Sequence, residues 1–237
     1  MQSVRSIPFR AIAAGILIAL AGICYSSWVL EFVLGSSLDP TRSFLSELDA
    51  AHRPYRNVYV AGDVTTAVCA MLAALLYWLP RPLTHSRWGL GATVALAVFG
   101  AATIADALSP IECIPRVDPD CPAEPSGILP QLHHIHALTS TIAVFAIFTA
   151  MVLGVVAARR DKFWPILRSW GLWILVIIAL ATAWMLAADN LHGDFRLGLA
   201  QRIQVGGMSI WLMLWGWAVS HPRPTSPKVD NPRIDVS

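Results

Sequence analysis

Residues 133–157 read HHIHALTSTIAVFAIFTAMVLGVVA, an apolar run of 25 residues without a single Asp, Glu, Lys or Arg. At 1.5 Å of rise per residue, about 20 such residues cross the hydrocarbon core of a membrane as an α-helix. A segment in lipid must satisfy its own backbone hydrogen bonds, which a single helix does and a single strand does not. The stretch therefore predicts a transmembrane helix that begins with histidines.

Comparable apolar runs recur along the whole chain. Of its 237 residues, 56% are hydrophobic and only 14% are charged, a composition typical of membrane proteins. The fold class that we expect is all-α, an integral membrane bundle over residues 12–219, preceded by an N-terminal segment (1–11) and followed by a tail (220–237) whose proline and charge content predicts disorder. Its six transmembrane helices are expected at residues 12–34, 57–79, 88–108, 133–157, 170–188 and 203–219.

Basic residues are shared unevenly between the two ends of the predicted bundle. The end that holds both termini carries 11 of the 17 Lys and Arg and 3 of the 15 Asp and Glu, whereas the opposite end carries 6 and 12. Loops rich in Lys and Arg stay in the cytoplasm. We therefore expect a multi-pass protein of the cell membrane with both termini cytoplasmic. The tryptophans expected at the cytoplasmic headgroup level are Trp78, Trp88, Trp164, Trp170 and Trp217.

Two loops at the predicted outer end have features of their own. Between the first two spans, DPTRSFLSELDAAHR (39–53) predicts a short helix lying flat on the membrane, with Asp39 as its cap and Pro40 at its first position. In the longest loop, Cys113 and Cys121 are expected to form a disulfide in an oxidising compartment. A zinc pair is the alternative, but the two cysteines lack the C-x-x-C spacing of such sites.

Unusual polar residues of the spans also gather at this outer end. Ionisable groups within membrane spans usually face the interior of the bundle and often serve function. We therefore expect a polar pocket that faces away from the cytoplasm. Its candidate residues are Glu47, Arg56, Asp63, Asp106, His133, His136, Ser140, Asp189, His192, Gln201 and Arg202.

Two functional interpretations of this pocket stay open. In the first, the protein is not an enzyme, and the pocket binds a membrane lipid headgroup, a small ligand or a partner protein; no nucleic-acid partner is expected. In the second, the protein is a hydrolase or transferase that acts on lipid at the outer leaflet with bound zinc. The metal ligands would then come from His133, His136, His192 and Asp106.

Other interpretations give the same residues a different role. The aspartates could simply pair with Arg202 in a structural network, while the histidines are solvated at the start of their helix. A proton-coupled carrier that uses Asp63 and the histidines is a further class. All 16 prolines fall in predicted loops or tails, so the sequence shows no sign of the interrupted helices of many transporters.

Four motifs resemble a known family. They are SFLSELDA (43–50), RPYRNVYVAGD (53–63), LHHIHALTS (132–140) and AQRIQVGG (200–207), and they resemble the multi-pass bacterial and archaeal membrane proteins of domain-of-unknown-function family 998. The resemblance runs from the first span to the sixth and implies the six-span architecture, but no activity. A second likeness, to the membrane hydrolases that include the alkaline ceramidases, implies zinc chemistry. Those enzymes have seven spans and an H-x-x-x-H pair, whereas this chain has six and His133-x-x-His136.

Overall fold

The computed structural model describes residues 9–79, 83, 86–115, 117–119, 121, 135–162, 164–189, 191 and 193–221. Within these residues the chain is helical and has no strand, so the predicted all-α fold is confirmed. The long helices are α1 (Phe9–Cys24), α3 (Arg56–Trp78), α4 (Arg87–Ala107), α6 (Ile135–Arg160), α7 (Leu172–Ala188) and α8 (Leu197–Ser220). The 3-10 turn η1 (Ser27–Leu30) and the short helix α2 (Glu31–Leu34) continue α1, and the π-helical turn η3 (Leu167–Gly171) precedes α7.

Six helical segments of the described chain are long and apolar enough to cross a membrane, which confirms the predicted spans. Their ends differ from the predicted ends by a few residues. The largest shift is in the sixth span, which begins at Leu197 because the polar side chains that follow it find partners inside the protein. Residues 1–8 and 222–237, which make up most of the predicted terminal segments, lie outside the described part of the chain. The segments are Phe9–Leu34, Arg56–Trp78, Arg87–Ala107, Ile135–Arg160, Leu167–Ala188 and Leu197–Ser220.

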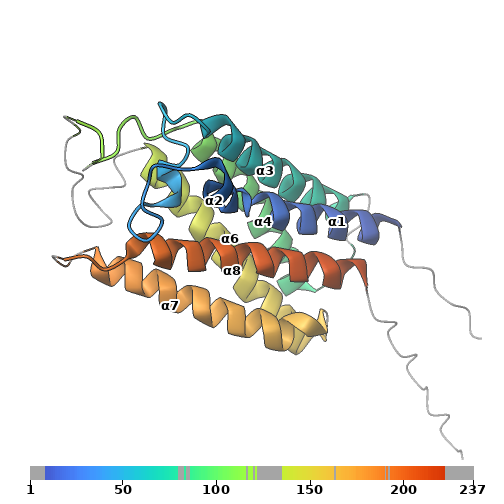
Figure 1. Ribbon diagram of the computed structural model, residues 1–237. Helices are drawn as coiled ribbons and strands as arrows, with labels where there is room; N and C mark the ends of the chain where they lie inside the picture. Colours follow the sequence, from blue (N-terminus) through green and yellow to red (C-terminus); the bar gives the residue numbers. More distant parts are fainter. Residues whose placement is uncertain are drawn as a thin grey trace, which may run out of the picture.

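The helices lie side by side in a single bundle (Figure 1). Helix α1 packs between α3 and α8, α4 packs between α3 and α6, and α7 packs mainly on α8. The first residue of α1 and the last residue of α8 lie at the same end, which we call the termini end. The opposite end is covered by residues 35–55 and by the described part of 108–121, which together we call the cap.

Glycines bring α1 and α8 into direct backbone contact. A Cβ atom placed on Gly15 would lie 2.5 Å from the carbonyl oxygen of Gly216, and a Cβ atom on Gly216 would overlap the carbonyl oxygen of Gly15. Helices in lipid are held together by close packing rather than by exclusion from water, so such contacts between small residues stabilise the bundle. These glycines therefore set the distance between the first and the last helix.

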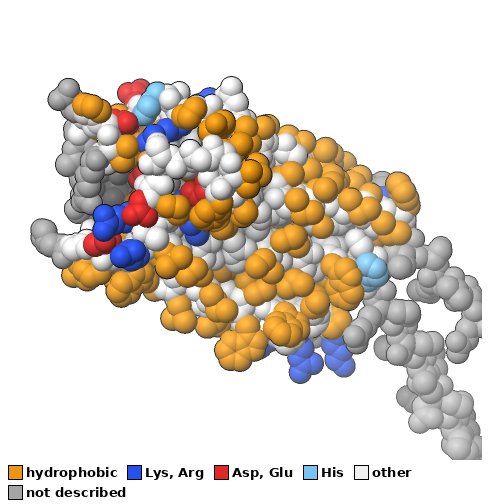
Figure 2. Space-filling model, viewed as in Figure 1, with side chains coloured by type: hydrophobic (Ala, Val, Ile, Leu, Met, Phe, Trp, Pro, Cys, Tyr) orange, Lys and Arg blue, Asp and Glu red, His pale blue; other side chains and the backbone are white. Residues whose placement is uncertain are grey.

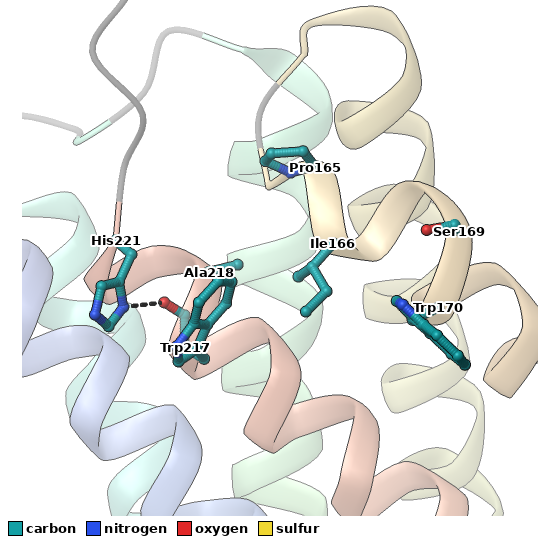
Figure 3. A pocket seen from close by; sticks show the side chains of 7 residues that line it. All are labelled: Pro165, Ile166, Ser169, Trp170, Trp217, Ala218 and His221. Atoms are coloured by element: carbon teal, nitrogen blue, oxygen red, sulfur yellow. Dashed lines mark hydrogen bonds between the residues drawn. The ribbon is translucent and has the colours of Figure 1, made fainter.

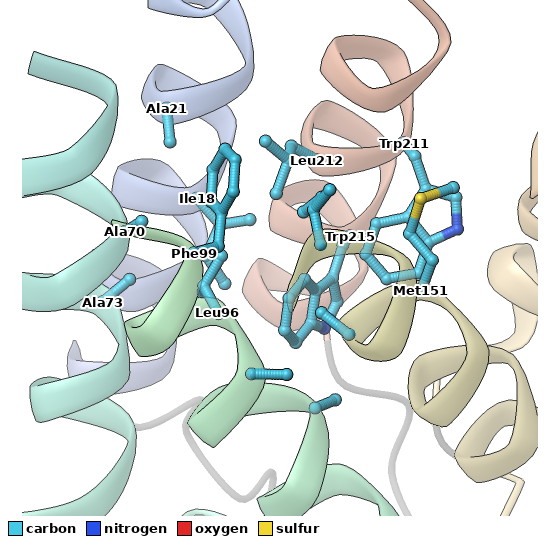
Figure 4. Packing of buried hydrophobic residues seen from close by; sticks show 14 of the residues in the cluster. Ile18, Ala21, Ala70, Ala73, Leu96, Phe99, Met151, Trp211, Leu212 and Trp215 are labelled. Atoms are coloured by element: carbon cyan, nitrogen blue, oxygen red, sulfur yellow. The ribbon is translucent and has the colours of Figure 1, made fainter. Parts of the chain in front are cut away.

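Large aromatic side chains fill the centre of the bundle. Trp211 and Trp215 of α8 are fully buried, Trp211 lies beside Met151 of α6, and Phe99 of α4 belongs to the same buried cluster (Figure 4). The rings of Trp211 and Trp215 lie 5.2 Å apart, and the ring of Trp164 lies 5.5 Å from that of Trp215. The prediction that Trp164 lies in an interfacial belt is wrong, because its side chain packs into this core and is only 6% exposed.

The outer surface of the helices is apolar. Figure 2 shows hydrophobic side chains as a broad band along the bundle, with most of the visible charged side chains at the cap and a few Lys and Arg at the lower edge. Helix α7 alone exposes Trp173 (62%), Ile177 (52%), Leu180 (67%) and Trp184 (49%). Soluble proteins rarely expose so large a contiguous apolar surface, whereas lipid covers it well. The protein is therefore a multi-pass membrane protein.

Candidate functional site: a polar cluster beneath the cap

The cap consists mainly of turns. The short helix expected between the first two spans is a single 3-10 turn, Leu45–Glu47. Asp39 does begin a turn, since its carboxylate accepts a hydrogen bond of 2.9 Å from the backbone N–H of Thr41. The two parts of the cap are joined by a hydrogen bond of 2.9 Å from the N–H of Ala51 to the carbonyl of Ile111.

Apolar packing and a disulfide hold the cap together. Leu38, Leu48, Ala50, Tyr59 and Ile114 form a small buried cluster separate from the main core. The predicted disulfide between Cys113 and Cys121 is confirmed and closes the second part of the cap on itself. The cap is thus a structured cover over the outer ends of the helices.

The first span is interrupted at Tyr25 and Ser26. Helix α1 ends at Cys24, and the hydroxyl of Ser26 donates to the carbonyl of Gly22 at 3.1 Å before the chain continues as η1 and α2. A Cβ atom on Gly62 of α3 would lie 2.6 Å from the Cβ of Ser27, so only glycine lets α3 pass this point. The first span is therefore interrupted where the sequence has no proline, so the positions of the prolines alone did not indicate this break.

The interruption directs Glu31 of α2 into a buried ion pair with Arg202 of α8. The Nε and Nη2 atoms of Arg202 donate to the two carboxylate oxygens of Glu31 at 2.7 Å each. Its Nη1 atom donates to the carbonyls of Ser43 in the cap and Gly198 in α8, at 2.7 and 3.0 Å. The two side chains are 6% and 1% exposed. The guanidinium group therefore joins α8, the first span and the cap.

Neighbouring residues of α8 complete this junction. The side-chain oxygen of Gln201 accepts a hydrogen bond of 2.5 Å from the N–H of Leu45 in the cap. A Cβ atom on Gly198 would lie 2.5 Å from the carbonyl oxygen of Ser43, so a larger residue would push the cap away. Arg202 takes part in a structural network, as one interpretation of the sequence expected. The carboxylate that pairs with it belongs to Glu31 and not to one of the aspartates. Glu31 is the only charged residue within residues 12–34, which is the signal that could have revealed it.

A second polar group lies where α4 ends and α6 begins. The Oδ1 atom of Asp106 accepts hydrogen bonds from the hydroxyls of Thr139 (2.7 Å) and Ser140 (2.9 Å). The Nδ1 atom of His136 lies 3.0 Å from the carbonyl oxygen of Ser109 and 3.3 Å from Oδ1 of Asp106. Three predicted pocket residues, Asp106, His136 and Ser140, are thus brought together.

Two further carboxylates approach this group. Asp49 of the cap is only 6% exposed, and its Oδ1 atom has no hydrogen-bond partner within the described residues. Burial raises the pKa of Asp49 to about 6; among its neighbours, His136 lowers the pKa and Asp106 raises it. Asp63 of α3 is half-buried, and the described residues whose charges act on it are Asp49 and Asp106. We call Asp49, Asp63, Asp106 and His136 the acidic cluster.

The remaining predicted residues are placed as follows. Arg56 begins α3, and its charge acts on Asp49. Glu47 lies in the 3-10 turn of the cap, and Asp189 follows the last residue of α7. His133 and His192 lie outside the described residues. Among the described residues, no three His, Cys, Asp or Glu are arranged to hold a metal ion, so the zinc site stays a prediction, as does the pocket itself.

The fold and the polar cluster define a class of protein, a six-span membrane bundle with ionisable residues beneath a disulfide-bonded cap. A family model described as protein of unknown function (DUF998) matches residues 18–218. The chain belongs to this family, and the resemblance inferred from its motifs is confirmed. No curated protein and no solved structure matches it.

Proposed function

We propose that the acidic cluster binds a small organic cation, and that this cation is the amine of a lipid headgroup. The observation that carries the proposal is the charge around Asp63. The two charges that act on it, those of Asp49 and Asp106, are both negative, and the described residues offer it no hydrogen bond or ion pair. A carboxylate that is partly removed from water and has no partner is costly, so a bound cation would stabilise it.

The neighbouring side chains suit an ammonium group. A primary ammonium has three donors and no acceptor, which suits a site whose neighbouring ionisable groups are mainly carboxylates. Tyr25 lies at the interruption of the first span, where the charges of Asp63 and Asp106 act on its hydroxyl group. Its ring lies 5.3 Å from that of Phe99 in an edge-on arrangement. Aromatic rings beside carboxylates favour organic cations over hydrated metal ions.

The depth of the cluster suits a phospholipid. Asp106 lies in the last turn of α4 and His136 in the first turn of α6, so the cluster lies where the helices leave the hydrocarbon. Headgroups occupy this level of a bilayer. The aminophospholipid headgroup ethanolamine combines the required charge with this location.

Binding to delipidated protein tests the proposal. Native mass spectrometry with dihexanoyl phosphatidylethanolamine and with dihexanoylglycerol, which has no headgroup and no charge, should show tighter binding of the amine lipid to the wild-type chain. Asp63→Asn removes one charge with little change of shape and should weaken that binding about tenfold, the value of one hydrogen bond to a charged group. Glu112→Gln, which changes an exposed acid of the cap, is the matched control and should bind as the wild type does. Equal binding by Asp63→Asn and the wild type would refute the proposal.

One observation favours zinc as a second candidate. The Nδ1 atom of His136 faces the carbonyl of Ser109 and the carboxylate of Asp106, the arrangement that orients metal-binding histidines and leaves Nε2 for the metal. The other nitrogen ligands would have to come from His133 and His192. Metal analysis of the purified protein distinguishes the candidates: stoichiometric zinc that is lost in a folded His136→Ala variant supports the enzyme, and metal-free protein that binds the amine lipid supports the first proposal.

A further inference from the structure

A groove lies at the termini end of the bundle, beside the start of the fifth span. It has a volume of about 930 Å³, which is within the range of small-molecule sites, and it is open to the surface. Figure 2 shows Lys and Arg side chains projecting from the lower edge of the molecule, where Figure 1 draws the end of α6 and the start of α7. Three of the lining residues are cationic and none is acidic: the groove is lined by Arg159, Lys162, Pro165, Arg168, Ser169, Leu172 and Trp173.

The backbone around the groove is held in place by buried residues. After α6 the chain reverses direction through left-handed conformations at Lys162 (φ 57°) and Trp164 (φ 47°). Trp164 packs on Trp215 in the core, and Leu167, in the π-helical turn, is fully buried. Arg168, which follows it, remains exposed. The cationic side chains of the groove therefore project from a fixed frame.

No described residue neutralises the three cations of the groove. Arg159, Lys162 and Arg168 are exposed, and none makes an ion pair or hydrogen bond within the described residues. The adjacent acid, Asp161, instead accepts a hydrogen bond from the hydroxyl of Ser86. The adjacent base Arg160 differs from the three cations of the groove because it has a partner within the protein: its guanidinium lies 5.4 Å from the ring centre of Trp88. The groove thus presents three cations that are available to an anionic ligand.

Apolar side chains continue the groove toward the lipid. Trp173 is 62% exposed, and Leu172 lies beside it in the wall. Figure 3 shows an adjoining hollow of about 310 Å³, in which Trp170 and Ile166 lie across from Trp217 at the end of α8; it shares Pro165 and Ser169 with the groove. Exposed indole rings are typical of the membrane interface. A ligand that fits both parts has an anionic head and apolar chains.

We propose that this groove binds an anionic phospholipid, with its phosphate between Arg159, Lys162 and Arg168 and an acyl chain along Leu172 and Trp173. The site is separate from the acidic cluster, which lies at the opposite end of the bundle and takes a ligand of opposite charge. This end is also the one predicted to face the cytoplasm, where anionic lipids concentrate and each nearby Lys or Arg strengthens their binding.

Lipid titration of the full-length, delipidated chain tests this proposal. Native mass spectrometry should show that dihexanoyl phosphatidylglycerol binds more tightly than dihexanoyl phosphatidylcholine. Arg159→Gln and Arg168→Gln should each weaken phosphatidylglycerol binding about fivefold, and the double variant about 25-fold, at roughly 1 kcal/mol per cation. Arg160→Gln is the matched control, because it removes a neighbouring charge that lies outside the groove, and it should change the affinity less than twofold. All three positions are exposed, so the melting temperatures of the variants should equal that of the wild type. If Arg159→Gln or Arg168→Gln fails to fold, Lys162→Gln takes its place in the test.

Two outcomes would overturn the proposal. If Arg160→Gln weakens binding as much as Arg159→Gln, the attraction belongs to the general positive surface and not to the groove. If soluble glycerol 3-phosphate competes with the lipid at equal concentration, the groove binds free phosphate and the apolar wall has no part in it.

Discussion

Arg202 and Glu31, which are 171 positions apart in the sequence, meet through two hydrogen bonds of 2.7 Å in the interior of the protein. This pair connects the last span to the part of the first span that follows its interruption. Because Arg202 also holds the carbonyl of Ser43, the position of the cap depends on the same guanidinium group. The cap in turn contributes Asp49 to the acidic cluster, so the ion pair and the candidate site are structurally linked.

Removing one partner of this pair should destabilise the protein strongly. Arg202→Met leaves the carboxylate of Glu31 buried without a counter-charge, and we expect the free energy of unfolding to fall by about 3–5 kcal/mol. The double variant Arg202→Met/Glu31→Leu removes both charges and should recover much of this loss. Chemical unfolding in detergent micelles, followed by tryptophan fluorescence, measures both values.

The exposed ion pair between Arg42 and Asp194 is the control. Its atoms also lie 2.7 Å apart, but the side chains are 62% and 41% exposed. Exposed pairs contribute little to stability, so Arg42→Gln should unfold almost as the wild type does. A loss in Arg202→Met no larger than that in Arg42→Gln would show that the buried pair does not hold the cap.

Asp49 should make stability depend on pH. Its pKa is about 6 in the folded protein and 3.8 in the unfolded chain, so between these values the folded state binds more protons. Stability should therefore fall as the pH rises from about 4 to about 6, by at most about 3 kcal/mol, and level off above pH 6. Asp49→Asn should remove this decline and be more stable than the wild type at pH 7.5. Melting temperatures across this range test the prediction, and a wild-type curve that rises instead would contradict it.

The contact between α1 and α8 should not tolerate even one added methyl group. Gly216→Ala places a Cβ against the backbone of α1, and we expect a loss of about 1–3 kcal/mol, the usual effect of overpacking. Gly206→Ala lies on the same helix, where the added Cβ would be 3.4 Å from one carbon of Trp28. This control should have little effect. Equal melting temperatures for the two variants would mean that the backbones are not in contact.

The orientation of the bundle can be tested with the disulfide. After reduction, a maleimide that does not cross membranes should label Cys113 and Cys121 in intact cells, because the cap is predicted to face outward. Cys24 and Cys69 lie in the first two spans and should remain unlabelled. Labelling of the cap only in inverted vesicles would reverse the predicted topology, and with it the side of the membrane that the acidic cluster faces.

The acidic cluster was only partly predictable. The sequence places Asp106, His136 and Ser140 at the same predicted outer end of the bundle, and the structure brings them into contact. Asp49 is not among the residues predicted for the pocket. The sequence of the loop does not show which of its acidic residues is buried in the folded protein. Arg202 and Gln201 were grouped with the cluster by depth alone, but the structure uses them to bind the cap.

The sequence by itself determined the number of spans, their approximate ends, the disulfide and the family, because crossing lipid requires long uncharged helices and these leave an unmistakable pattern. Only the tertiary structure decided which side chains meet. The faces of these helices that touch lipid and those that touch protein are both apolar, so hydropathy does not show how each helix is rotated. That rotation depends on close contacts such as Gly15 with Gly216, and on the interruption at Tyr25 that turns Glu31 toward Arg202.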